Sequence, residues 1–148
     1  MNNTLHNSKD FEGMRKAGNL AASTLDLLVE HVKPGVSTDE LDYFAFEFIT
    51  KNGGLIAPLF YKGFPKSICT SINHVICHGI PSSRILEEGD IVNIDVTVIV
   101  DGWHGDTSRM FPVGKINAKA QKLIDCTFES MHEGIKAAGP NSRLGDIG

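Results

Sequence analysis

The residues best placed to do chemistry are two aspartates in an otherwise apolar stretch, IVNIDVTVIVDGWHGDTSRMF at positions 91–111. Asp95 lies among aliphatic neighbours, where an unpartnered carboxylate would be costly. If Asp95 and Asp106 approach each other, like charges that are half removed from water would raise one pKa unless a cation lies between them. A divalent metal site is one interpretation. The other is that both aspartates are solvated or cap local backbone groups, as aspartates near turns commonly do.

A β-hairpin would bring the two aspartates together. Residues 91–100 alternate between aliphatic and polar side chains, which predicts a strand with one buried face. The dipeptide Asp101-Gly102 favours a two-residue type I′ turn, so the chain should fold back directly. If the residues that flank this turn pair with each other, Asp106 lies opposite Thr97 and diagonal to Asp95 on the same face.

Hydrophobic periodicity predicts three helices around this hairpin. The first runs from Phe11 to Val32, with Ser8 as its N-cap and Pro34-Gly35 as its stop. The second starts at the capping box Ser37-Thr38-Asp39-Glu40 and ends at Asn52-Gly53-Gly54. The third runs from about Asn117 to Ala138, and its stripe of phenylalanine, methionine and leucine is predicted to be core. Short strands are expected at Leu55–Tyr61 and Ser67–Ile72.

Composition is that of an ordinary globular domain, because 41% of the 148 residues are hydrophobic and 22% are charged. The net charge of −4 argues against a specific nucleic-acid surface. No apolar run approaches the ~20 residues that a membrane span needs. Three cysteines without metal-site spacing favour reduced thiols. The predicted compartment is the cytoplasm.

Three separated motifs resemble one known family. They are the helical opening from Phe11 to Asp42, the run YKGFPKSICTSINHVICHGIP from Tyr61 to Pro81, and the hairpin sequence. In this order and spacing they resemble the bacterial-type (type I) methionine aminopeptidases. The resemblance implies an α+β fold, the first half of a pita-bread fold, with an antiparallel sheet and helices on one face. It implies a single domain over residues 1–148 that is truncated, with the N-terminal half of that fold and the start of the second.

The same resemblance implies a metallo-aminopeptidase that removes the initiator methionine when the next residue is small. Asp95 would bind one of two divalent metal ions with both oxygens, and Asp106 would bridge the pair. Carboxylates and imidazole suit Mn, Fe, Co or Zn, among which the sequence does not choose. A hydroxide between the metals would attack the peptide carbonyl. Thr97 would support the two aspartates, and with an N-terminal Met1-Asn2 the protein would keep its own methionine.

Substrate-binding residues are implied in the second motif. His78 matches the family histidine that hydrogen-bonds the substrate near the scissile amide, so the catalytic role falls to it. Tyr61, Phe64 and Cys69 match the lining of the methionine pocket. Without the resemblance, His78 is more simply a loop histidine that caps backbone groups, and Tyr61 and Phe64 are packing residues.

The implied partners are the N-terminal peptide of newly made proteins and, as a candidate, the ribosome. The protein is expected to be a monomer without a membrane or a specific nucleic-acid partner. This chain alone is expected to be inactive, since the family takes three further metal ligands from the second half of the fold. The alternatives are a non-catalytic pita-bread binding module, a prolidase-like dipeptidase, and a complete single-domain metal-binding protein.

Overall fold

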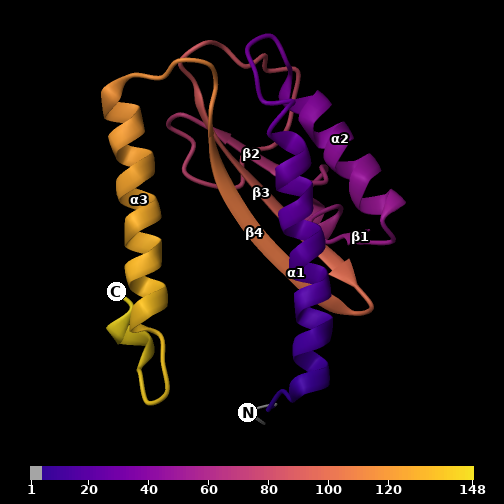
Figure 1. Cartoon of the computed structure of the whole chain (residues 1–148). Coiled ribbons are helices and arrows are strands. Elements are labelled where there is room, and N and C mark those ends of the chain that lie inside the picture. Colours follow the sequence, from indigo (N-terminus) through magenta and orange to yellow (C-terminus); the bar gives the residue numbers. More distant parts are fainter. Residues whose placement is uncertain (1–4) are drawn as a thin grey trace. The chain divides into compact units, whose positions relative to one another are not determined.

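The structure is a computed structural model that describes residues 5–148, so the expectation about Met1 and Asn2 lies outside the described residues. The chain forms two compact units that divide after Lys115, and each unit is described by itself. The first unit holds helices α1 (Ser8–Leu28) and α2 (Thr38–Lys51) and strands β1 (Leu55–Ile56), β2 (Cys69–Ile72), β3 (Ile91–Val100) and β4 (Trp103–Pro112) (Figure 1). The second unit holds helix α3 (Ala118–Ala137).

Strand β3 is the centre of an antiparallel sheet. Its ten residues pair with β4 along their whole length. The other edge of β3 pairs with two short strands in tandem, β1 opposite Val98 and Ile99 and β2 opposite residues 92–95. The segment between β1 and β2, residues 57–68, leaves this edge and returns to it.

The β3–β4 hairpin confirms the predicted register. Val100 pairs with Trp103, and Thr97 lies opposite Asp106. Asp101 and Gly102 have φ angles of 51° and 85°, as the central residues of a type I′ turn require.

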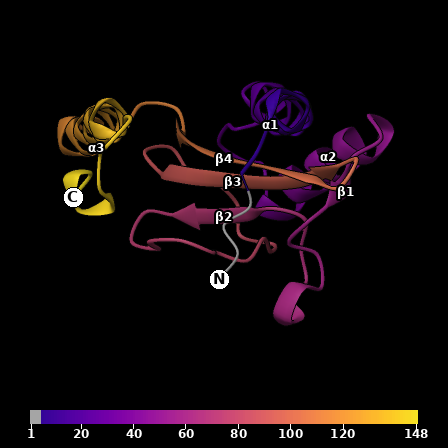
Figure 2. The same cartoon turned by 90° about the horizontal axis from the view of Figure 1, so that it is seen from below.

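Helix α1 lies over one side of β3 and β4 (Figure 2). Its N-cap is Asn7 and not the predicted Ser8, because the side chain of Asn7 accepts the Lys9 amide at 2.9 Å while the Asn7 amide donates to Asp10 at 2.8 Å. The helix also ends at Leu28, before the predicted stop at Pro34-Gly35, because amides at positions 31 and 32 both donate to the Leu28 carbonyl and close a turn there.

Phe11 and Met14, two of the apolar residues whose periodicity predicts this helix, are exposed. At this end of α1, Gly13 lies close to the sheet, because an added Cβ would meet the Trp103 ring. Farther along, α1 contacts β4 at Gly105, where a Cβ would overlap the backbone of Ala17. Small residues therefore set the separation of helix and sheet.

Helix α2 begins where the sequence predicted. The Ser37 hydroxyl accepts the Glu40 amide at 3.2 Å, and the Glu40 carboxylate accepts the Ser37 amide at 2.8 Å, which completes the capping box. The buried carboxylate of Asp42 then accepts the amides of Ser67 and Ile68 at 2.7 and 3.1 Å. Helix α2 thereby holds the residues that lead into β2.

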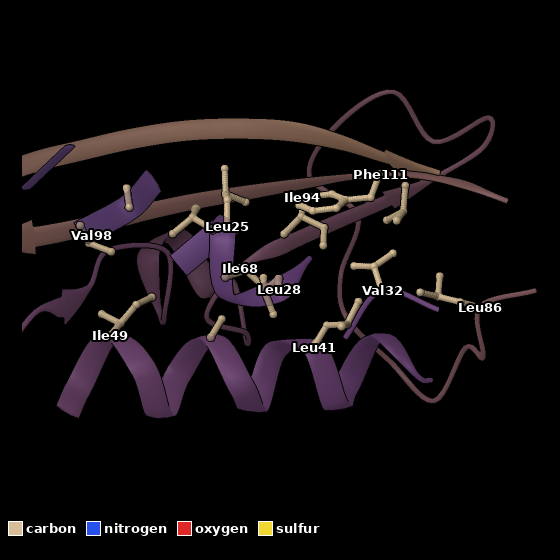
Figure 3. Close-up of a cluster of buried hydrophobic side chains, with 14 of the residues drawn as sticks. Leu25, Leu28, Val32, Leu41, Ile49, Ile68, Leu86, Ile94, Val98 and Phe111 are labelled. Carbon is tan, nitrogen blue, oxygen red and sulfur yellow. The ribbon is translucent and has the colours of Figure 1, made fainter. Parts of the chain in front are cut away.

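The core of the first unit lies between the two helices and one face of the sheet. Figure 3 shows side chains of α2 pointing toward those of the strands, with α1 residues between them. Five alternate residues of β3 are buried on this face, as the sequence predicted: Val92, Ile94, Val96, Val98 and Val100.

The two edge strands are shorter than predicted. Residues 61–63 form a 3₁₀ turn instead of continuing a strand, with Phe60 and Lys62 in left-handed conformations at φ 66° and 47°. The amide of Phe60 donates to the Phe64 carbonyl at 2.7 Å, so local turns satisfy backbone groups that a longer strand would have paired.

In the second unit, α3 has its predicted bounds and its cap, since the Asn117 side chain accepts the Ala120 amide at 2.9 Å. The prediction that its apolar stripe is core is wrong for the chain as described, because Leu123, Phe128 and Met131 are all at least half exposed. Periodicity shows that a helix has an apolar face, but burial needs a second element to cover that face. A short 3₁₀ turn follows at Leu144–Asp146.

None of the helices within residues 5–148 is both long and apolar enough to cross a membrane. The three cysteines are free, as the sequence predicted.

Candidate metal and substrate site

Asp95 and Asp106 lie on the sheet face opposite the buried valines. Asp106 is directly across from Thr97, and Asp95 is across from Ser108, so the two aspartates are diagonal neighbours on adjacent strands. The hairpin therefore brings the two carboxylates together as the sequence predicted. Asp95 is half-buried and Asp106 is exposed, so one side of the pair is open to solvent.

Burial raises the pKa of Asp95, and the charge of Asp106 and a hydrogen bond with it raise that pKa further. The nearby His78 acts in the opposite direction. A pair of carboxylates in this state resists carrying two negative charges, and a divalent cation would remove the repulsion. The aspartate pair therefore fits a metal ion by its donor chemistry. Within residues 5–148, no group of three or more His, Cys, Asp or Glu side chains could hold a metal, so the pair is a partial set of ligands.

Cys69 faces Asp95 across the β2–β3 pairing. Burial raises the pKa of this thiol to about 11, with smaller contributions from Asp95, Cys77 and Asp106. The thiol is therefore protonated at neutral pH and acts as a soft, uncharged wall beside the aspartates.

Thr97 lies on the same face as both aspartates and is half-buried. Its carbonyl accepts the Ala57 amide at 3.1 Å, which joins the loop after β1 to the centre of β3. The backbone of Thr97 contacts Ala57 on one side of β3 and pairs with Asp106 on the other, so the position of the Thr97 side chain next to the carboxylates is fixed. Whether it supports metal ligands stays a prediction.

His78 is in the loop between β2 and β3 and is exposed. It adopts a left-handed backbone conformation, with φ of 56°, which is uncommon for a residue other than glycine and is typical of functional sites. Its effect on the pKa of Asp95 places it within electrostatic reach of the carboxylate pair. The structure thus brings His78 toward the aspartates, and its catalytic role stays a prediction.

Tyr61 and Phe64 lie in the 57–68 segment that leaves the sheet edge. Tyr61 is 65% exposed and Phe64 is half-buried, and a hydrogen bond of 3.0 Å joins the Phe64 amide to the Tyr61 carbonyl. The two residues lie at the two ends of one turn. Their part in a methionine pocket stays a prediction.

A cavity of about 250 Å³ lies along β2, and it contains none of the residues predicted for the site. The Thr70 hydroxyl on its wall is buried and has no hydrogen-bond partner among residues 5–148. His74, to which the sequence assigned no role, also lines this cavity. The cavity and the aspartate pair are thus separate features of the first unit.

Two residues that shape the site were not identified by the sequence analysis. Ser71 and Asn73 anchor the ends of the loop that carries His78, through hydrogen bonds to Gly79 and Ile91. The signal available in the sequence was weak. An asparagine after a strand often adopts a left-handed turn, but nothing in its spacing reveals its partner.

Comparison with known proteins shows which family this chain is similar to. The sequence matches the profile of Metallopeptidase family M24 over residues 12–148. The methionine aminopeptidase of Rickettsia prowazekii is 58% identical over 144 residues, which are 97% of this chain and 56% of that protein. Methionine aminopeptidase A of a Synechocystis strain is 53% identical over 146 residues, 98% of this chain and 58% of that protein.

The crystal structure of the Rickettsia prowazekii methionine aminopeptidase superposes with a TM-score of 0.96 and 57% identity, over 97% of this chain and 58% of that one. The expected fold, the first half of a pita-bread fold, is therefore confirmed. The chain spans slightly more than half the length of these relatives.

Proposed function

Because this chain belongs to Metallopeptidase family M24, we propose that it is the part of a methionyl aminopeptidase that carries the metal-binding aspartates. The reaction is removal of the initiator methionine from newly made proteins when the next residue is small. The observation that carries the proposal is that Asp95 and Asp106 lie diagonally next to each other on the open face of the β3–β4 hairpin. Its support from the comparisons is the 58% identity to a methionine aminopeptidase.

The metal site that we propose takes Asp95 and Asp106 as ligands for two divalent ions, drawn from Mn, Fe, Co and Zn. Carboxylate oxygens suit these ions, and a bound cation would offset the repulsion that raises the pKa of Asp95. When bound, such ions lower the pKa of water and polarise a peptide carbonyl. Since the aspartates are a partial set of ligands within the described residues, we propose that this chain by itself has no measurable turnover.

The other site residues have distinct proposed roles. His78, within electrostatic reach of the aspartates, hydrogen-bonds the substrate near the scissile amide. Cys69 is a neutral wall of the methionine pocket, and its soft sulfur suits a thioether side chain. Tyr61 and Phe64 complete that pocket, and Thr97 supports the aspartates.

The proposed partner is the N-terminal peptide of a newly made protein, with the ribosome as the place of encounter. The net charge of −4 favours a peptide partner over a nucleic acid. We further propose a monomeric protein that works in the cytoplasm.

The test is a chimera in which this chain replaces the matched 144 residues of the Rickettsia prowazekii relative. Supplied with Mn or Co, the chimera should release methionine from Met-Ala-Ser but not from Met-Phe-Ser. Asp106→Asn should abolish release. The matched control is Asp101→Asn in the same hairpin, where the exposed turn carboxylate contacts Lys16 at 2.6 Å and the left-handed conformation tolerates asparagine.

The control should retain activity. A folded chimera that is inactive, or that cleaves both peptides equally, would contradict the proposal. Titration of this chain alone with Mn gives a second readout, because the Asp106→Asn variant should bind the ion more weakly than the Asp101→Asn variant.

A further inference from the structure

The loop that carries His78 is fastened at both of its ends. At its start, the Asn73 side chain accepts the Ile91 amide at 3.0 Å and donates to the buried carboxylate of Asp90 at 2.8 Å. The Asn73 amide donates to the Ile91 carbonyl at 2.9 Å. These bonds join the first residue of the loop to the beginning of β3.

At its other end, the loop is fastened to β2 through Gly79. The Gly79 carbonyl accepts the Thr70 amide at 2.8 Å, and the Gly79 amide donates to the Ser71 hydroxyl at 3.1 Å. A Cβ at position 79 would approach the Thr70 carbonyl carbon to 2.8 Å, so only glycine allows this close approach. Both polar backbone groups of the residue directly after His78 are thus held by β2.

The Ser71 side chain is on the sheet face of the aspartate pair. Ser71 lies opposite Asn93 on β3, two residues from the position where Cys69 faces Asp95. Alternate residues of a strand share a face, so Ser71, Cys69 and Asp95 project to the same side. Ser71 is only 3% exposed, which shields its hydrogen bond to Gly79 from water.

This arrangement accounts for the conformation of His78. A left-handed backbone at a non-glycine residue persists only where the surroundings hold it. The residue after His78 is fixed by two hydrogen bonds, while residues 74–77 reach it from the anchored Asn73. The acceptor for the amide that follows His78 is a single side chain, the Ser71 hydroxyl.

We propose that Ser71 is a positioning residue for His78. Its hydroxyl, by accepting the Gly79 amide, holds His78 in its left-handed conformation. The importance of this for catalysis rests on the proposed function, in which His78 contacts the substrate. The anchoring itself is a property of the chain and does not depend on that function.

The first experiment measures hydrogen exchange of the Gly79 amide by NMR in the full 148-residue chain. Ser71→Ala removes the acceptor, and exchange at Gly79 should become about tenfold faster, the effect of losing one hydrogen bond. The backbone coupling constant of His78 should also move away from its left-handed value. Ser71→Thr keeps a hydroxyl at the same atom and should restore both signals. The matched control is Ser83→Ala, at an exposed serine.

Urea unfolding of each variant separates a local change from a global loss of stability. Unchanged exchange at Gly79 and an unchanged coupling constant at His78 in Ser71→Ala would overturn the proposal. So would a failure of Ser71→Thr to restore them in a variant that is as stable as the wild type. None of these readouts needs turnover, so they remain decisive if the proposed function fails.

The second experiment uses the chimera and its release of methionine from Met-Ala-Ser. Ser71→Ala should lower kcat while His78 is present, and should cause no further loss in a His78→Ala background. Equal losses in both backgrounds would show that Ser71 acts on the site by another route and would overturn its positioning role.

Discussion

Substitution of Gly105 by alanine tests how closely α1 packs on the sheet. The added Cβ would lie 2.5 Å from the Gly18 nitrogen and would overlap the backbone of Ala17. Ordinary contacts between nonbonded heavy atoms begin near ~3.5 Å. Helix α1 would therefore have to move by about 1 Å along its contact with β4, since these clashing atoms are backbone and no rotamer can relieve them.

Overpacking of this kind costs about 1–3 kcal/mol. Replacing a glycine within a strand returns about 0.5–1 kcal/mol of backbone entropy. The net loss for Gly105→Ala should be about 1–2 kcal/mol, which lowers the midpoint of urea unfolding by about 1 M at an m-value near 1–2 kcal/mol/M.

The matched control is Gly18→Ala on the facing helix. A Cβ at Gly18 has no heavy atom within 4 Å, so alanine should raise stability by up to about 1 kcal/mol through its better helix propensity. The assay is urea denaturation of both variants beside the wild type, followed by circular dichroism. If Gly105→Ala is as stable as the wild type, the close contact between α1 and β4 does not require glycine at position 105, and the reasoning is refuted.

The remaining predictions concern two buried titrating groups. Burial is the largest effect on the Asp42 carboxyl group and raises its pKa. The contribution of this carboxyl group to the stability of the fold is therefore present at low pH and is lost as the pH rises through the raised pKa. The stability of the wild type relative to Asp42→Asn should therefore fall in urea melts as the pH rises above the ordinary aspartate pKa of about 3.9, and a constant difference would refute this. The pKa of the Cys69 thiol is raised from an ordinary 9.0 to about 11, so at pH 8 its thiolate fraction should be about 100-fold smaller than that of an ordinary cysteine. Cys69 should therefore react with iodoacetamide after the exposed Cys77 and Cys126. Peptide mapping that finds Cys69 alkylated first would show that it is not buried as described.

The hairpin was predictable because two local signals agree. The alternation of residues 91–100 assigns a face to each side chain, and the Asp101-Gly102 turn then leaves only one register. The position of Asp106 opposite Thr97 follows from these two facts alone. Helix α2 was predictable for a similar reason, since its capping box is formed by residues only three apart.

Other features depend on contacts between distant segments. From the sequence, Gly105 is only a weak strand former. Its role, which is to allow close contact between β4 and the backbone of α1, is visible only in the folded structure. Histidine is only modestly favoured in the left-handed conformation, so the residue type gives a weak signal for His78, and we attribute the conformation to Ser71 and the residue that follows. Asp42 is likewise unremarkable in the helix pattern, although it holds two amides from a segment 25 residues away.

The candidate site divides in the same way. The aspartate pair could be reached from spacing and turn chemistry, whereas Tyr61 and Phe64 came only from resemblance to a family. Their turn is built from local hydrogen bonds and left-handed residues, which hydrophobic periodicity does not describe.

The tandem placement of β1 and β2 on one edge of β3 has a consequence for how this protein can change in evolution. The chain between them, residues 57–68, starts with an amide fixed to the Thr97 carbonyl and ends with two amides fixed to Asp42. Both ends are secured to the scaffold, so we expect substitutions or changes of length between these anchors, in residues 58–66, to leave the pairing of the sheet in place. New specificities could thus be sampled in this segment while the strand that carries Asp95 keeps its place.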